Sequence, residues 1–493
     1  MEIDRKTVSK KIEQNEPIII RFNYAEPELL MFMNSILAKM LAKIDHQYLL
    51  NSAITILREI VVNAIKANSK RVYFIKNGLD IQNPEQYEKG MILFKKNVIG
   101  EFDAIKDDME RSDYFVELDV NLTKDDLLIR VSNNCPIMPE ELERINFRID
   151  RAKKYSDFSE AYEEVDDDSE GAGLGIVLTI LFLKNMGINP DSYKITSSKG
   201  LTQTFITIPK DLKPVEVTSK LKTHIVEEIE GVPTFPDNII QLQRLCLNPQ
   251  SSIDDITKRI SMDPALVTDV LKLSNSAGFI QGKRIDSIST AVMTIGLKNV
   301  NAILTASNAR RILSQRYKHY EQIWIHCNKT AFYARTIALT AKMTAQVENA
   351  FLAGLLHDLG KIILLATDMN LVEKISGIVK ERKMITSTVM EEISIGVSHS
   401  EIGGLIALKW KFPEYLVDAI SYHHAPLSSS PENRDLLFAV YLANMLCGIE
   451  DRKYNYFYIE EQVLERFNIL DEAKFKEYHE KMKLKFEDQK KFL

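Results

Sequence analysis

Apolar and polar positions follow different periods in the two halves of the chain. In the first half, apolar residues recur at helical spacing over residues 26–43 and 46–68, and the charged segment 139–165 also has a helical pattern. Shorter segments between them alternate in the way that half-buried strands do. The strands are predicted at 17–22, 71–75, 114–120, 126–132, 193–197 and 203–209. Long helices combined with antiparallel strands predict an α+β two-layer sandwich.

The second half has a helical pattern throughout, and a polar segment separates it from the first. Residues 210–222 contain Pro214 and show little periodicity, which is typical of a boundary between domains. After about residue 225 no strand pattern is convincing. The predicted organisation is an α+β domain at 1–210 with an insertion at 77–112, a linker at 211–224, an all-α domain at 225–430 and a helical extension at 431–493.

Composition narrows the class of protein. The 493 residues are too many for one hydrophobic core, and the 45% hydrophobic and 27% charged residues are typical of a globular protein. A net charge of -6 gives no evidence of nucleic-acid binding, and four cysteines without a Cys-x-x-Cys pair favour a reducing compartment. With no signal-peptide pattern and no uninterrupted apolar run of membrane length, we expect a cytoplasmic protein that is not inserted in a membrane.

Three glycines at alternate positions precede an apolar helical segment in the first domain. Gly171, Gly173 and Gly175 stand in the run Glu-Gly-Ala-Gly-Leu-Gly, whose leucine is Leu174. Glycine lets the backbone approach a ligand closely, and the N-terminus of a helix attracts anions. The run is therefore a candidate phosphate site, although tight turns between packed helices use the same pattern.

One face of the predicted helix at 46–68 carries three polar side chains. Glu59 and Asn63 are four residues apart, and Lys66 lies three residues further on. The amide oxygen can bind Mg²⁺, the carboxylate can take a proton from water, and the ammonium can neutralise a phosphate. The same residues also fit the solvated face of an amphipathic helix.

Four segments in the correct order resemble the nucleotide-binding boxes of the histidine-kinase-like ATPase (GHKL) superfamily. They are residues 58–67, 131–138, 170–175 and 200–205. The resemblance implies an ATP site with Mg²⁺ under a mobile lid at 139–168, with Asn63 as the Mg²⁺ ligand and Glu59 as the base if ATP is hydrolysed. The residues that the resemblance places at ATP are Asn63, Lys66, Asn133, Gly171, Gly173, Leu174, Gly175 and Thr204.

The chain departs from that superfamily's pattern at three positions. Asn133 stands where the superfamily has an aspartate that binds adenine, and Cys135 and Ile137 replace two glycines. A neutral amide accepts a hydrogen bond more weakly than a carboxylate does, so we expect weaker ATP binding. His46 is the only histidine upstream, and too little chain precedes it for a phosphoacceptor hairpin. Autophosphorylation of the sensor-kinase type is therefore not expected.

The segment 225–430 resembles the HDOD domain, an all-helical module of bacterial signalling proteins. The resemblance is carried by residues 229–236, 263–266, 271–277 and 288–297. It implies a relationship to the HD metal-hydrolase superfamily, although HDOD domains usually lack the complete metal site and act in regulation.

Five histidines and an aspartate in this half are candidate metal ligands. They are His326, His357, Asp358, His399, His423 and His424. The His-Asp pair lies in residues 354–361, which resemble the HD signature, and such a pair can serve two metal ions with a bridging water as nucleophile. Imidazole with carboxylate suits Fe, Mn or Zn. Asn444 stands in place of the superfamily's late aspartate, and the loss of an anionic ligand weakens a divalent site.

Three functions stay open on these grounds. The leading one is a cytoplasmic bacterial signalling protein that binds ATP and Mg²⁺ and transmits its state through the HDOD module to a partner protein. The second is a metal-dependent phosphohydrolase that acts on a nucleotide or a cyclic dinucleotide. The third is an ATPase or a serine kinase that acts on a partner protein. Whether the chain forms a homodimer is left open.

Overall fold

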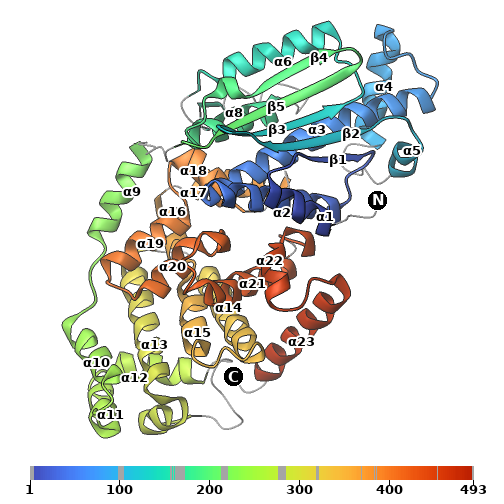
Figure 1. Cartoon of the computed structure of the whole chain (residues 1–493). Coiled ribbons are helices and arrows are strands. Elements are labelled where there is room, and N and C mark those ends of the chain that lie inside the picture. Colours follow the sequence, from blue (N-terminus) through green and yellow to red (C-terminus); the bar gives the residue numbers. More distant parts are fainter. Residues whose placement is uncertain are drawn as a thin grey trace. The chain divides into compact units, whose positions relative to one another are not determined.

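The computed structural model describes residues 5–490, with the gaps listed next. The gaps are 98–104, 156–157, 159, 162–172, 213–219, 276–284, 318–320, 368, 382–383, 385 and 452. The chain divides into two compact units, Met1–Val217 and Thr218–Leu493, whose helices and strands are labelled in Figure 1. Each unit has its own buried apolar residues.

The first unit combines an antiparallel sheet with helices. Its strands are β1 (Ile18–Phe22), β2 (Val116–Leu122), β3 (Asp126–Asn133), β4 (Lys194–Ser198) and β5 (Leu201–Pro209). Its helices are α1 (Arg5–Gln14), α2 (Pro27–Lys43), η1 (Gln47–Leu49), α3 (Leu50–Lys76), α4 (Pro84–Asn97), α5 (Lys106–Glu110), α6 (Pro139–Ala152), α8 (Gly173–Asn185) and η3 (Pro190–Ser192).

The five strands lie in the order β1-β2-β3-β5-β4, and every neighbouring pair is antiparallel. In β1 the side chains of Ile18, Ile20 and Phe22 are buried, whereas those of Ile19 and Arg21 are exposed. Because successive side chains of a strand point to opposite faces, this alternation buries one face of the sheet. Helix α3 packs against β2 and β3. The prediction of a sheet covered by helices is confirmed, and the more specific GHKL sandwich stays a prediction.

One predicted strand is wrong. Residues 71–75 belong to the last turns of α3, which ends at Lys76 before Gly78 with its φ of 63°. Val72 and Phe74 are both buried, and the Phe74 ring packs against Tyr87 of α4. Because a second helix covers the outer side of α3 here, alternate residues become apolar and imitate the pattern of a strand.

Every regular element that the structure describes after residue 219 is a helix, in agreement with the prediction. The helices are α9 (Lys220–Gly231), α10 (Asp237–Leu247), α11 (Ile253–Ser261), α12 (Pro264–Ser274), α13 (Ile288–Arg316), α14 (Glu321–Thr340), α15 (Val347–Leu356), α16 (Leu359–Thr367), α17 (Met369–Glu381), α18 (Thr388–Ile395), α19 (His399–Lys409), α20 (Glu414–Tyr422), η4 (Pro426–Ser428), α21 (Arg434–Glu450), η5 (Tyr456–Tyr458), α22 (Glu461–Arg466) and α23 (Glu472–Lys490).

The centre of this unit lies where α14, α15 and α21 pack together and α16 packs against α19. Helix α21 falls in the predicted extension at 431–493, yet all its residues from Leu436 to Gly448 are buried. Helix α23 is also attached, because Phe475, His479 and Met482 are buried on one of its faces. Residues 220–224 of the predicted linker are helical, as part of α9, and 213–219 lie outside the described residues.

Two helical stretches are long and apolar enough to cross a membrane, Gln47–Lys76 and Val347–Thr367. Their most apolar windows are 61% and 78% buried inside the protein. Helices that are covered on several sides become apolar around most of their circumference, so this composition is also typical of core helices.

Candidate metal centre

Several helices that are separate in the sequence bring the six predicted metal ligands together. They come from α14 (His326), the junction of α15 and α16 (His357 and Asp358), the start of α19 (His399) and the end of α20 (His423 and His424). Gly360 allows α16 to cross α19 closely, because a Cβ atom at this position would collide with the carbonyl oxygen of His399. Helices far apart in the sequence therefore meet at one buried point.

The Asp358 carboxylate lies between two groups of imidazoles. Its Oδ1 atom is 3.4 Å from Nε2 of His399 and 3.3 Å from Nε2 of His423. Its Oδ2 atom is 3.5 Å from Nε2 of His357 and 3.7 Å from Nε2 of His326. The ligand atoms form two sets that share the aspartate. One set contains Asp358, His399, His423 and His424, and the other contains His326, His357 and Asp358.

Hydrogen bonds at the outer ring nitrogens fix three of the imidazoles. Nδ1 of His357 lies 2.8 Å from the carbonyl oxygen of Gly354, and Nδ1 of His423 lies 2.8 Å from that of Ile420. A carbonyl oxygen only accepts, so each Nδ1 carries the proton and each neutral ring keeps its lone pair on Nε2. Nδ1 of His399 bonds in the same way to Oε2 of Glu391, at 2.7 Å. These outer bonds are typical of histidines that bind metal through the inner nitrogen.

The inner nitrogens face one another in a way that requires a positive charge between them. Nε2 of His399 lies 3.2 Å from Nε2 of His423. With both Nδ1 atoms protonated, two neutral rings would point lone pairs at each other and at the Asp358 carboxylate. Among the described residues, Oδ1 of Asp358 and Nε2 of His357 are buried without a hydrogen-bond partner. A proton or a metal ion resolves this arrangement, and the donors fit a transition metal.

The charge states also suit a metal ion. Burial lowers the pKa values of His357 and His424 well below the usual range and that of His326 to about 4, so these rings are neutral at pH 7. Burial opposes ionisation of Asp358, but Lys361 and the neighbouring imidazoles outweigh it and hold its pKa well below the ordinary value. Burial also lowers the pKa of His399, and the Glu391 carboxylate more than compensates, so the net shift is upward.

Two functional residues of this centre did not emerge from the sequence. Glu391 is buried in α18 and accepts hydrogen bonds from the backbone N–H of His399, at 2.8 Å, and from its ring. The available signal was weak, because the segment Thr388–Ile395 contains two adjacent carboxylates, Glu391 and Glu392, and the local sequence does not show which one is buried. Lys361 lies one helical turn after Asp358 and places its ammonium 2.8 Å from Oδ2. Its spacing of three residues from the aspartate predicts this contact once the helix is known.

Asn444, which replaces an aspartate in the resemblance to HD enzymes, lies directly at the centre. This residue of α21 is buried, and its Oδ1 is 3.0 Å from Nε2 of His326. The position therefore faces the ligand set that contains His326 and His357.

The described residues predicted to bind ATP are spread over four elements of the first unit, α3, α8, β3 and β5. Glu59, Asn63 and Lys66 lie on α3, and the amide nitrogen of Asn63 is 3.3 Å from Oε1 of Glu59. Gly173, Leu174 and Gly175 form the first turn of α8, and Gly171 lies outside the described residues. Helix α3 packs against α8 and β3, so these elements are neighbours. The Mg²⁺ and ATP contacts themselves stay predictions.

Two other predicted ATP contacts lie on the sheet. Asn133 ends β3 and is buried, and its amide donates to Oδ1 of Asn68 at 3.0 Å. Thr204 of β5 is paired in register with Val131. Cys135 is buried, and burial raises the pKa of its thiol. The amide nitrogen of the Asn133 side chain is therefore already hydrogen-bonded within the protein, to Asn68.

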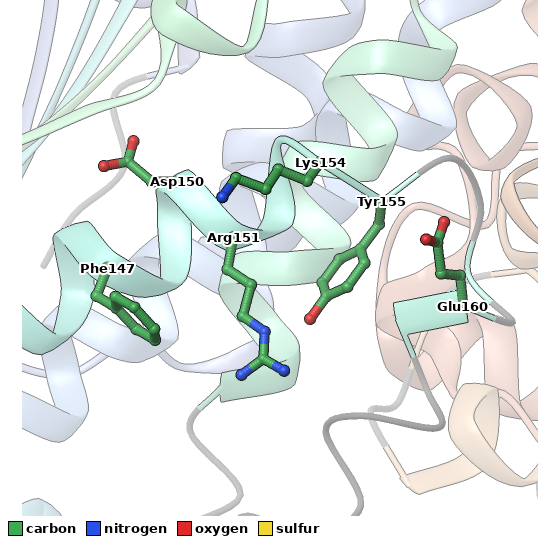
Figure 2. Close-up of a pocket in the computed structure, with 6 residues that line it drawn as sticks. All are labelled: Phe147, Asp150, Arg151, Lys154, Tyr155 and Glu160. Carbon is green, nitrogen blue, oxygen red and sulfur yellow. The ribbon is translucent and has the colours of Figure 1, made fainter.

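A pocket of about 380 Å³ opens beside α6, outside the set of predicted ATP residues. Figure 2 shows its lining side chains on α6 and the chain that follows it. They are Phe147, Asp150, Arg151, Lys154, Tyr155 and Glu160. These residues fall in the segment that the sequence predicts as a lid.

A family match confirms the HDOD domain predicted in the helical unit. The HDOD domain family matches residues 232–426. An HDOD domain protein of unknown function from Geobacter sulfurreducens is 23% identical over 55% of this chain and 97% of that chain, with a TM-score of 0.44. A candidate metal-dependent phosphohydrolase from Shewanella amazonensis SB2B is 17% identical over 55% of this chain and 100% of that chain, with a TM-score of 0.38.

A further relative spans both units. An uncharacterized protein of Treponema pallidum (strain Nichols) is 30% identical over 485 residues, which are 98% of this chain and 94% of that protein. The similarity thus includes the sheet-containing unit as well as the helical one. The chain carries an HDOD domain and belongs to the family of this Treponema pallidum protein.

Proposed function

We propose that the helical unit is a metal-dependent phosphohydrolase that acts on a phosphoester of a nucleotide or a cyclic dinucleotide. The proposal rests on one observation, the convergence of imidazole Nε2 atoms on the buried Asp358 carboxylate. Imidazole and carboxylate ligands suit Fe, Mn or Zn, and a bound ion of this kind polarises a phosphoryl oxygen and lowers the pKa of water. The name of the Shewanella amazonensis protein is compatible with this chemistry.

The residues of the centre have distinct roles in this proposal. Asp358 supplies the anionic ligand, and His399 and His423 face its Oδ1 atom. Glu391 orients the His399 ring through the Nδ1 proton. Lys361 reduces the negative charge of Asp358, which otherwise would repel the phosphate of a substrate.

Metal content and hydrolysis together test the proposal. Purified protein is expected to retain a transition metal after dialysis, as measured by elemental analysis, and to hydrolyse at least one member of a panel of nucleotides and cyclic dinucleotides. Asp358→Asn is expected to lose both the metal and the hydrolysis. His224→Gln is the matched control, because His224 is an exposed histidine on α9. Protein that binds no transition metal under any loading condition would refute the proposal.

A second candidate function concerns the first unit, which we propose binds ATP with Mg²⁺ and passes its state to a signalling partner. The supporting observation is the packing of α3 against both α8 and β3, with Glu59 and Asn63 hydrogen-bonded on α3. Titration with Mg-ATP is expected to give weak binding that Asn63→Ala reduces further. Absence of binding at millimolar concentration would exclude this function, and unchanged phosphate release in Glu59→Ala would exclude Glu59 as the base of an ATPase or serine kinase.

A further inference from the structure

The two oxygens of Asp358 face surroundings of different charge. The ammonium of Lys361 lies on the Oδ2 side, 2.8 Å from that oxygen. Nε2 of His326 and Nε2 of His357 lie on the same side, at 3.7 and 3.5 Å. A divalent cation bound by Oδ2 and these two rings would have to share the oxygen with a positive charge. Coulomb repulsion in a buried site therefore disfavours an ion on this side.

A second contact closes the same side. The amide of Asn444 lies 3.0 Å from Nε2 of His326. The amide engages Nε2 in either orientation, because its oxygen accepts from Nε2–H and its NH₂ group donates to the Nε2 lone pair. An aspartate at this position would instead add an anionic ligand. With His326 engaged, only Oδ2 and Nε2 of His357 remain on this side, and two protein ligands are few for a transition-metal site.

Among the described residues, neither the Lys361 ammonium nor the Asn444 amide is recorded in contact with Oδ1 or with the rings on its side. Oδ1 itself has no hydrogen-bond partner, and it lies within 3.4 Å of Nε2 of both His399 and His423. His424 completes a set of four ligand atoms that all lie within 4.8 Å of one another. The opposed Nε2 atoms of His399 and His423, 3.2 Å apart, are stabilised by a proton or a metal ion between them, and a metal ion can use both lone pairs.

We propose that this centre binds one transition-metal ion per chain, held by Asp358, His399, His423 and His424, while Lys361 and Asn444 keep the His326 and His357 side empty of metal. This inference rests on the proposed metal-binding function and specifies its stoichiometry and its ligands. The Lys361 ammonium takes the place that a second cation would have beside the shared carboxylate.

The stoichiometry of bound Zn²⁺ tests the inference. The full chain is loaded with Zn²⁺, dialysed, and analysed for metal per chain. We expect one ion in the wild-type protein, one ion in His326→Gln, and none in His423→Gln or His424→Gln. Thermal unfolding monitored by circular dichroism identifies any variant that fails to fold, and such a variant is replaced by His399→Gln.

A gain of binding provides the second arm of the test. The double variant Lys361→Met with Asn444→Asp is expected to bind two Zn²⁺ ions, which misfolding cannot produce. Co²⁺ loading adds a spectroscopic count, because a second Co²⁺ ion would change the visible absorption of the variant relative to the wild type. Two ions in the wild-type protein, or loss of the ion in His326→Gln with retention in His423→Gln, would overturn the inference alone. No ion in the wild-type protein or in any variant would overturn the proposed function as well.

Discussion

At the scale of single residues, the centre depends on which ring nitrogen each histidine leaves for a ligand. His357 and His423 use Nδ1 for backbone carbonyl oxygens, and His399 uses it for the Glu391 carboxylate. A carboxylate increases the basicity of an imidazole more than a carbonyl oxygen does. We therefore expect Glu391 to strengthen metal binding by His399 more than the backbone carbonyl groups strengthen binding by His357 and His423.

Substitution of Glu391 tests this influence. We expect Glu391→Gln to weaken Zn²⁺ binding about 10- to 100-fold, because an amide oxygen accepts the Nδ1 proton more weakly than a carboxylate. Calorimetric titration measures the affinity. Glu392→Gln is the control, since burial raises the pKa of Glu392 to about 8 and the neutral acid resembles the amide at pH 7. Equal losses in both variants would contradict the role of Glu391.

At the scale of helices, close crossings and buried polar contacts hold the unit in register. Gly360 of α16 lies against the backbone of α19 at His399, where even a methyl group would collide. Polar contacts join other helices of the unit, since Glu450 of α21 accepts from Tyr333 of α14 at 2.7 Å and from His479 of α23 at 3.1 Å. Both contacts connect elements that are distant in the sequence.

The glycine at the crossing has a measurable effect. Gly360→Ala is expected to lower the free energy of unfolding by about 1–3 kcal/mol and to reduce Zn²⁺ binding, because the added methyl group displaces the start of α19. Gly377→Ala is the matched control, because a Cβ atom there meets nothing within 4 Å and lies in α17. This control is expected to stabilise the protein by about 0.4–1 kcal/mol. Urea unfolding measures both, and similar values would contradict the close crossing.

The Glu450 network predicts a pH dependence of stability. Burial alone would raise the pKa of Glu450, but hydrogen bonds from His479, Lys329 and Tyr333 lower it to about 2. A carboxylate with a lowered pKa stabilises the folded state above the pKa of the unfolded chain, and this contribution declines as the pH falls from about 4.5 towards 2. At neutral pH this shift corresponds to at most about 3 kcal/mol, and solvent around the partly exposed carboxylate reduces the contribution.

The comparison of two proteins at two pH values measures that contribution. Glu450→Gln is expected to be less stable than the wild type in urea unfolding at pH 7, and the difference is expected to shrink at pH 3.5. Glu432→Gln, on the loop before α21, controls for the loss of one carboxylate. A difference that is the same at both pH values would contradict the lowered pKa.

At the scale of the whole molecule, the two compact units have separate cores and separate candidate ligands. A ligand that binds only the folded state stabilises the unit to which it binds, by about 2.7 kcal/mol at a free concentration of 100 times its Kd. The two proposed functions can therefore be distinguished by which unit each ligand stabilises.

Differential scanning calorimetry of the full chain makes this distinction. We expect two unfolding transitions. Zn²⁺ is expected to raise the midpoint temperature of one of them, and Asp358→Asn is expected to abolish that shift. Mg-ATP is expected to raise the midpoint temperature of the other transition, and Asn63→Ala is expected to abolish that second shift. A Zn²⁺ shift that persists in Asp358→Asn would place the metal elsewhere.

Much of the secondary structure could be predicted from local pattern. All five strands lie close to predicted segments, because the side chains along each strand alternate between a more buried and a more exposed face. The strand predicted at 71–75 failed because the cover provided by α4 is not visible in the local sequence. The role of α21 in the core was missed for a similar reason, since its apolar residues do not reveal which helices they contact.

The sequence by itself determined the residue types of the centre, the replacement of an aspartate by Asn444 and the helical class of the second unit. Only the tertiary structure decided that Lys361 and Asn444 share one side of Asp358 while His399 and His423 share the other. The physical reason is that the local sequence gives the type of each candidate ligand directly. Which oxygen of Asp358 each group faces depends instead on how helices that are tens of residues apart pack against one another.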